Sequence, residues 1–105
     1  NDQANNEKVL SEMTEVLDGQ RGCRFRCVLA LVGEGLCKTF SGTCEGTLLQ
    51  EYRGSGGFGY DPLFLPKESD STFAEISSEE KAQISHRARA LGKLMEYLRE
   101  RLSLN

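Results

Sequence analysis

The sequence lacks a long apolar run, a large net charge and an apolar amino terminus, which are typical of membrane, nucleic-acid-binding and secreted proteins respectively. Its longest apolar run, residues 28–32, is far shorter than the roughly 20 residues that a membrane-spanning helix needs. The net charge is only −3, which does not favour non-specific binding to nucleic acid or to an anionic membrane. The opening NDQANNEKVL is polar and is not typical of a signal peptide. We therefore expect one soluble domain over residues 1–105, with no nucleic-acid or membrane partner.

Cysteine and histidine are too few and too scattered to indicate a zinc site. The one histidine is His86, and the four cysteines include no second close pair; they are Cys23, Cys27, Cys37 and Cys44. A reduced cysteine within an apolar run, such as Cys27, behaves as a small hydrophobic side chain. We therefore expect reduced structural thiols, no metal site among these residues and a cytoplasmic location.

Two segments have apolar residues at the spacing of an α-helix. The first follows Asn5 or Asn6, either of which is a natural N-cap, and ends at Asp18-Gly19. The second begins at a capping box, Ser77-x-x-Glu80, and continues toward the carboxyl end. Its predicted apolar stripe consists of Ile84, Ala88, Leu91, Met95, Leu98 and Leu102.

Between these two helices the sequence predicts extended structure. FRCVLALV, residues 25–32, is typical of a buried strand, and GEG then turns the chain into a second strand over 36–40. In the extended segment that follows, Gly42 and Gly46 indicate bulges or close backbone contacts. PLFLP, residues 62–66, predicts a short strand bracketed by prolines. The order predicts a mixed α/β fold with a largely antiparallel sheet and flanking helices.

The stretch GSGGFGYDP, residues 54–62, begins like the glycine-rich loop of a protein kinase. Pro62 stands where the kinase strand would continue, and no kinase lysine or catalytic loop follows, so this interpretation fails. The glycines still permit positive φ and close approach of a ligand to the backbone. Phe58 and Tyr60 offer faces on which a base can stack, and Asp61 offers an acceptor for a base edge. The alternative is a hairpin whose aromatic rings enter the core.

A second cluster, EEKAQISHRARAL, brings Lys81, His86 and Arg87 into a short window. In one unbroken helix Lys81 and Arg87 lie about 60° to either side of Ile84, and His86 lies on the opposite face. These three side chains then do not converge. A break at Ser85, with Ser85 capping a second helix, would let them share a site. The alternative is a solvated basic face with a surface histidine.

Together, GSGGFGYDPLFLP and TFAEISSEEKAQISHRARAL resemble the carboxy-terminal half of the inosine triphosphate pyrophosphatase family, which removes ITP, dITP and XTP. NDQANNEKVL, RFRCVLAL and GTCEGTL also fit this family in order and spacing, so the resemblance covers nearly the whole chain. It implies an ITPase-like fold and a cytoplasmic, homodimeric hydrolase. The implied reaction converts a non-canonical purine nucleoside triphosphate to the monophosphate and pyrophosphate.

The resemblance also implies what individual residues do. The base pocket would be lined by Phe58, Gly59, Tyr60 and Asp61. Phe58 would stack on the purine, and Asp61 with His86 and Arg87 would read the edge that carries the 6-oxo group. Such a site discriminates strongly, because adenine has an amine where hypoxanthine and xanthine have a carbonyl. Lys81 would neutralise charge on the bound nucleotide.

The family pattern is incomplete in this chain. Ala82 and Ala88 stand where family members often have Asn and Gly, although the charged groups beside them are intact. The family's Ser-x-Asn-x-x-Lys phosphate loop and its Asp-Ser-Gly segment, with the expected general base and Mg²⁺ contact, have no counterpart before Asn1. We therefore expect the Mg²⁺ ligands upstream, no catalytic residue in this chain, and no activity from the chain alone. The alternatives are a naturally short nucleotide-binding module and an oligomerisation domain with relic motifs.

Overall fold

The computed structural model describes residues 1–101, so Leu102 of the predicted stripe lies outside the described residues. The three strands form one sheet in the order β1-β2-β3, in which β2 and β3 are antiparallel. This arrangement of helices around an antiparallel sheet confirms the predicted fold class. The elements are α1 Asp2–Glu12, β1 Gly22–Gly33, β2 Leu36–Leu48, β3 Phe64–Pro66, α2 Ser78–Ile84 and α3 His86–Arg101.

The chain forms two compact units, and the long strands β1 and β2 contribute to both. Unit 1 comprises residues 1–24 and 45–78, and unit 2 comprises residues 25–44 together with the chain from Glu79 onward. The single domain expected from the chain length stays a prediction. None of the described helices combines the length and apolar composition that crossing a bilayer requires.

The core of unit 1 forms around β3 and the turn that follows it. Leu63, Phe64 and Phe73 are buried, and the rings of Phe64 and Phe73 lie 5.0 Å apart. β3 pairs with the end of β2, where Thr47 is opposite Leu65. A side chain at Gly46 would collide with the backbone carbonyl of Leu65. The close backbone contact expected at Gly46 is therefore confirmed.

Helix α1 begins earlier than the sequence predicted, so both predicted caps were wrong. The side chain of Asn1 is the cap, because its oxygen accepts a hydrogen bond from the Ala4 N–H at 2.8 Å. The helix ends at Glu12, and the buried guanidinium of Arg21 donates to the carbonyls of Met13 and Val16 just beyond it. The Met13 carbonyl also accepts from the Val16 N–H at 3.1 Å, so Arg21 is its second donor.

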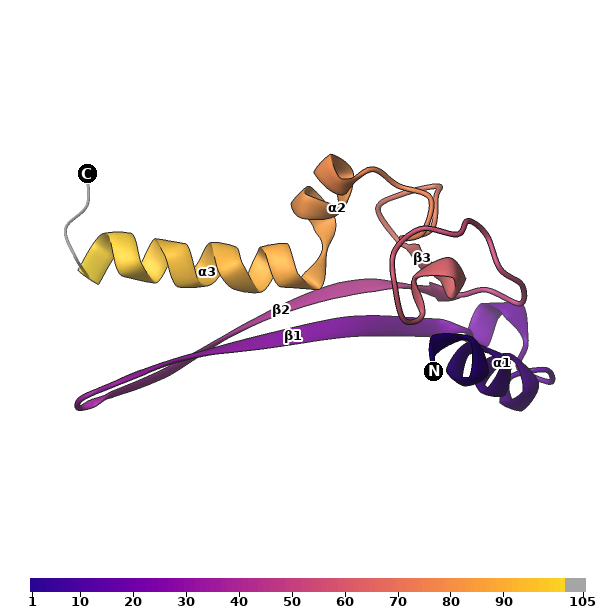
Figure 1. Ribbon diagram of the computed structural model, residues 1–105, viewed down its shortest axis with the longest axis horizontal. Helices are drawn as coiled ribbons and strands as arrows, with labels where there is room; N and C mark the ends of the chain where they lie inside the picture. The colour runs from indigo at the N-terminus through magenta and orange to yellow at the C-terminus, as the bar shows by residue number, and fades with distance from the viewer. Residues whose placement is uncertain (102–105) are drawn as a thin grey trace. The chain divides into compact units, whose positions relative to one another are not determined.

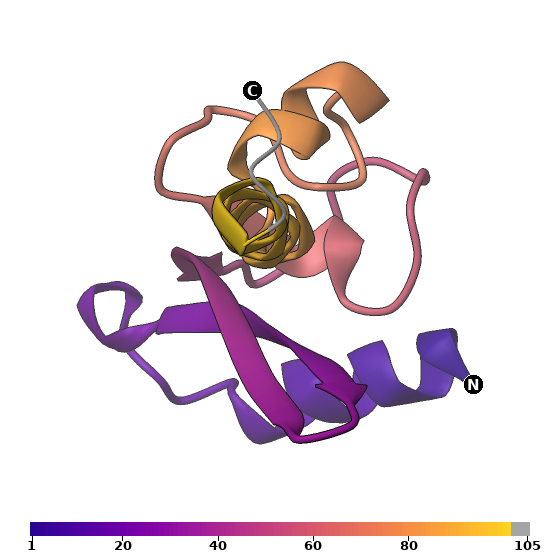
Figure 2. The same cartoon turned by 90° about the vertical axis from the view of Figure 1, so that its left-hand side faces the viewer.

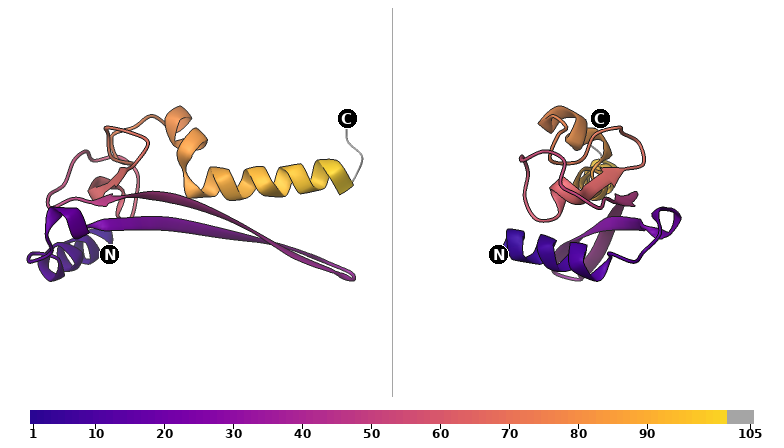
Figure 3. Two further views of the ribbon diagram at one scale, coloured as in Figure 1. Left: turned by 180° about the vertical axis from the view of Figure 1, so that it is seen from behind. Right: turned by 90° about the vertical axis from the view of Figure 1, so that its right-hand side faces the viewer.

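Unit 2 is a hairpin with α3 along it. Figure 1 shows α3 running beside the two strands, and Figures 2 and 3 show the same pairing from one end and from behind. The His86 ring lies 4.9 Å from Phe25, and the Tyr97 ring lies 5.4 Å from Phe40. Lys93 Nζ also donates to the Ser41 carbonyl at 2.7 Å. One helix face therefore contacts both strands.

The face of α3 that packs is not the predicted apolar stripe. Leu91 and Met95, which belong to that stripe, are 51% and 42% exposed, whereas Ala90 is fully buried. The stripe was deduced for one helix that runs through Ile84, but a new helix begins at His86. Contact with the hairpin sets which side of this second helix faces inward.

Gly42 is the closest point between β2 and α3. A Cβ there would collide with the backbone of His86 and Ala90 and would lie 2.8 Å from the Arg89 Cβ. We expect Gly42→Ala to lower the free energy of unfolding by roughly 1–3 kcal/mol, because helix and strand must separate. Urea denaturation followed by circular dichroism measures this.

Gly92→Ala is the matched control for Gly42→Ala. Gly92 is inside α3, and no described atom outside its chain neighbours and the adjacent backbone of that helix lies within 4 Å of its Cβ position. This substitution is expected to raise stability by roughly 0.5–1 kcal/mol through helix propensity. Equal stability of Gly42→Ala and the unsubstituted chain would contradict the packing of β2 on α3.

Candidate functional site

The glycine-rich loop, residues 54–62, is folded back on itself in unit 1. Its two ends meet where the Arg53 N–H donates to the Pro62 carbonyl at 3.0 Å. Three of its glycines, Gly54, Gly57 and Gly59, have φ of 89°, 71° and 61°. Residues with side chains rarely adopt these angles, so the loop uses the positive φ that its glycines were expected to permit.

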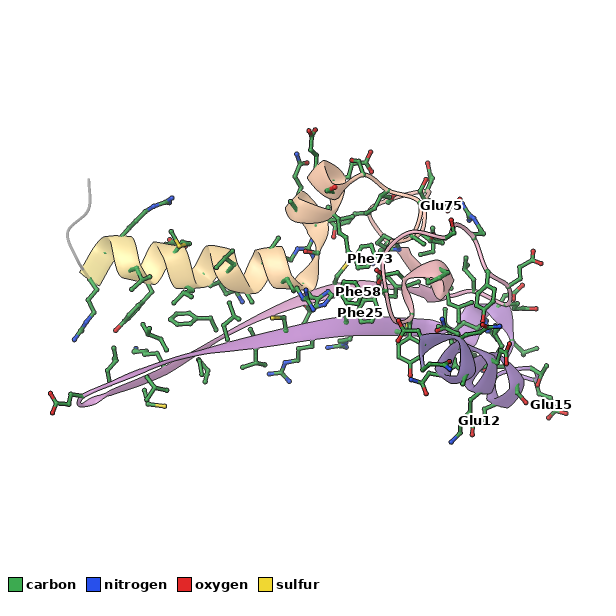
Figure 4. All side chains as sticks on the ribbon, in the orientation of Figure 1. Glu12, Glu15, Phe25, Phe58, Phe73 and Glu75 are labelled. Carbon is green, nitrogen blue, oxygen red and sulfur yellow. The ribbon has the colours of Figure 1, made fainter. Side chains whose placement is uncertain are left out.

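One side of the loop contacts the turn that contains Ala74 and Glu75. Figure 4 labels Glu75. The Gly56 N–H donates to the Ala74 carbonyl at 3.2 Å. Glu75 accepts from the Thr72 N–H at 2.8 Å and forms an ion pair of 3.2 Å with Arg53. The Thr72 hydrogen bond, helped by Arg53, holds the pKa of the Glu75 carboxyl below its ordinary value.

The other side of the loop is bound by helix α1. Asp2 Oδ2 accepts from the Gly59 N–H at 2.9 Å, and Asn6 Nδ2 donates to the Gly59 carbonyl at 3.0 Å. A cavity of about 230 Å³ lies here, lined by loop residues, the first turns of α1 and Tyr52. Its volume is below the roughly 300 Å³ at which ligand pockets usually start.

Within the loop, Phe58 is presented to solvent and Asp61 is not. Phe58 is 57% exposed and Tyr60 is 38% exposed, so flat ligands can reach their rings. Asp61 is 4% exposed, and its Oδ2 accepts from the Phe58 N–H at 3.0 Å. A side chain at Gly57 would collide with this carboxylate. One oxygen of Asp61 therefore holds the backbone of Phe58.

The second predicted cluster lies where α2 ends and α3 begins. Ser85 separates the helices, is buried, and accepts from the Ala88 N–H through its Oγ at 3.1 Å. The predicted break at Ser85 and its capping role are confirmed. Lys81 lies on α2, whereas His86 and Arg87 open α3. Arg87 is exposed, and His86 is partly covered by the hairpin through its contact with Phe25.

The structure thus keeps the predicted site residues in two groups. The loop group belongs to unit 1 and consists of Phe58, Gly59, Tyr60 and Asp61. The helix group belongs to unit 2 and consists of Lys81, His86 and Arg87. Sequence reasoning missed Asp2 and took Asn6 for a cap. The signal for Asn6 is an asparagine in the middle of a helix, where its propensity is poor.

The described residues contain no cluster of metal ligands, and Cys23 among them has a raised pKa. Within residues 1–101, no three His, Cys, Asp or Glu side chains gather into a group that would hold a metal ion. The described residues therefore do not fit Mg²⁺ as a ready ligand set. All four cysteines lie in the described part of the chain, and none of them is paired in a disulfide there. Burial raises the pKa of the Cys23 thiol although Arg21 opposes it, which disfavours the reactive thiolate.

Comparison with known proteins points to one family. A model of the Ham1 family matches residues 1–97. A protein from Bacillus subtilis named dITP/XTP pyrophosphatase is 53% identical over 98 residues, which cover 92% of this chain and 50% of that protein. A protein of the same name from Desulforamulus reducens is 51% identical over 98 residues, covering 92% and 49%. The chain spans about half the length of the curated relatives it matches.

Solved structures agree with this match. The structure of the Staphylococcus aureus Ham1 protein superimposes with a TM-score of 0.91 at 37% identity, over 96% of this chain and 52% of that one. A HAM1 protein from Coxiella burnetii gives a TM-score of 0.86 at 38% identity, over 94% and 52%. The likeness therefore extends over both compact units of the chain.

Proposed function

Because the chain belongs to the Ham1 family, we propose that it recognises the base in an enzyme that hydrolyses non-canonical purine nucleoside triphosphates to the monophosphate and pyrophosphate. The substrate class is ITP, dITP and XTP, and the likeness to proteins named dITP/XTP pyrophosphatase supports it. The observation that carries the proposal is the exposed ring of Phe58 on a rigidly bonded glycine loop. A flat purine stacks on such a ring.

The helix group supplies selectivity in this proposal. His86 and Arg87 donate hydrogen bonds to the 6-oxo group, and Lys81 neutralises charge on the nucleotide. Asp61 holds Phe58 in place through its Oδ2, and its other carboxylate oxygen would accept from the ring N–H next to the 6-oxo group, which adenine lacks. A donor set that meets an amine in place of a carbonyl leaves polar groups unpaired, so ATP is rejected.

We further propose that residues 1–105 correspond to the carboxy-terminal half of such an enzyme. The share of the relatives that the chain covers, 49% and 50%, supports a half. Cleavage between phosphates needs charge neutralisation and an activated water. Mg²⁺ supplies the first, and its ligands and the catalytic carboxylate belong to the other half. A homodimer in the cytoplasm, where thiols remain reduced, completes the proposal.

Two measurements on the purified chain test the proposed function. Calorimetric titration is expected to show ITP binding in preference to ATP, and a pyrophosphate assay with Mg²⁺ is expected to show no turnover. Adding the remaining half should then restore turnover that is selective for ITP. Binding without turnover in the completed protein would favour a nucleotide-binding module instead. If ITP does not bind, the family likeness holds for the fold alone.

A further inference from the structure

Two side chains of α1 bind the same residue of the glycine-rich loop. Asp2 and Gly59 are 57 residues apart in the sequence, and Asn6 and Gly59 are 53 apart. Asp2 accepts from the Gly59 N–H, which belongs to the Phe58–Gly59 peptide. Asn6 donates to the Gly59 carbonyl, which belongs to the Gly59–Tyr60 peptide. The two bonds therefore fix both peptides that flank Gly59.

Gly59 has open space on the side where a Cβ would stand, so packing on that side does not hold its conformation. Apart from Gly59 itself and its neighbours Phe58 and Tyr60, no described atom lies within 4 Å of that Cβ position, and φ there is 61°. Glycine has the widest backbone freedom of any residue. Asn6 is only 4% exposed, so its Nδ2 makes this contact away from solvent, while its Oδ1 is buried with no hydrogen-bond partner among the described residues.

Resting on the proposed function, we propose that Asp2 and Asn6 are positioning residues for base recognition. They hold the Gly59 peptides and thereby set the Phe58 ring in its stacking orientation before the nucleotide arrives. Asp61 fixes the Phe58 N–H within the loop, whereas Asp2 and Asn6 fix the following peptides from outside it. A ring that is oriented in advance loses less freedom on binding, so affinity is higher.

Asn6→Asp tests this with minimal change of shape. It replaces the Nδ2 donor by an acceptor that faces the Gly59 carbonyl, and so turns an attraction into a repulsion. Asn5→Asp is the matched control, because Asn5 is the exposed neighbour on the same helix and gains the same charge. The chain has no tryptophan, so Phe58→Trp, introduced in every protein tested, gives one fluorescent reporter at the loop.

Time-resolved anisotropy of the reporter and its quenching by ITP are the two readouts. We expect Asn6→Asp to increase the local rotation of the reporter and to weaken ITP binding roughly tenfold, with Asn5→Asp unchanged in both. Unchanged rotation would overturn the proposal, even if affinity fell. If Asn6→Asp increases the local rotation of the reporter but the parent with Phe58→Trp does not bind ITP, the proposed function fails and the positioning contact stands. If Asn6→Asp does not fold, Asp2→Ala is compared with Glu7→Gln under the same criteria.

Discussion

Phe58→Ala is expected to weaken ITP binding by this chain roughly 5- to 150-fold. The estimate corresponds to the roughly 1–3 kcal/mol that stacking of a base on an aromatic side chain contributes. Phe58 is 57% exposed, so removing its ring leaves little cavity and the fold should persist. Calorimetric titration with ITP measures the affinity, and circular dichroism verifies folding.

Two further variants separate stacking from general apolar contact. Phe58→Leu keeps apolar surface but removes the flat face, so it should lose most of the affinity that Phe58→Ala loses. Leu17→Ala removes a side chain of unit 1 that is 69% exposed and lies outside the loop, so its affinity should not change. Full ITP affinity in Phe58→Ala would mean that the base binds elsewhere, against the proposed role of the loop.

What the sequence predicted correctly depends on local chemistry. The strand over residues 25–32 lies within β1, and PLFLP contains β3, because apolar runs bounded by turn residues specify strands locally. The prediction that the first of these strands is buried was wrong, since none of its residues is buried and Val28 and Val32 are 53% and 72% exposed. The break at Ser85 follows from a serine that caps the next helix. The family resemblance is confirmed at the level of the Ham1 family, whereas the assignment to a carboxy-terminal half stays a prediction.

What the sequence did not predict depends on contacts between distant segments. Asn6 was one of two candidate caps of a helix, yet its amide binds Gly59. Leu91 and Met95 fit an apolar stripe, yet they are exposed because the hairpin meets another face of α3. The spacing of apolar residues predicts a helix, but it does not determine which face of that helix the neighbouring strands will cover. Only the tertiary partner decides that.

Arg21 is the clearest example of a structural role that no local sequence pattern indicates. Its side chain is 3% exposed, and its guanidinium donates to four backbone carbonyls. Two of these carbonyls lie just after α1, and the other two lie at the end of β2 and just after it. One side chain therefore joins the segment after α1 to the end of β2. The four acceptors, with their distances, are Leu48 at 2.7 Å, Met13 at 2.8 Å, Leu49 at 3.1 Å and Val16 at 3.2 Å.

Arg21→Ala is expected to lower the free energy of unfolding by about 3–5 kcal/mol. Each buried carbonyl that loses its only donor costs about 1–3 kcal/mol. The Met13 carbonyl keeps the Val16 N–H as a donor, and water will reach some of the other three. Such a loss is a large share of the roughly 5–15 kcal/mol that stabilises a typical domain. Arg21→Lys should recover only part of it, because one ammonium cannot span four acceptors in the planar arrangement of a guanidinium.

Arg24→Ala is the matched control for Arg21→Ala, because Arg24 is also an arginine and lies three residues further along the chain, on β1. Its side chain is 63% exposed and forms one ion pair, 3.5 Å from Glu45, so its loss should cost less than about 1 kcal/mol. Urea denaturation of the two variants gives the comparison, and hydrogen exchange of α1 tells where the structure loosens. If Arg21→Ala unfolds at the same urea concentration as Arg24→Ala, other groups must hold the end of α1 to β2. A large difference, with exchange rising first at the end of α1, would identify Arg21 as the group that joins them.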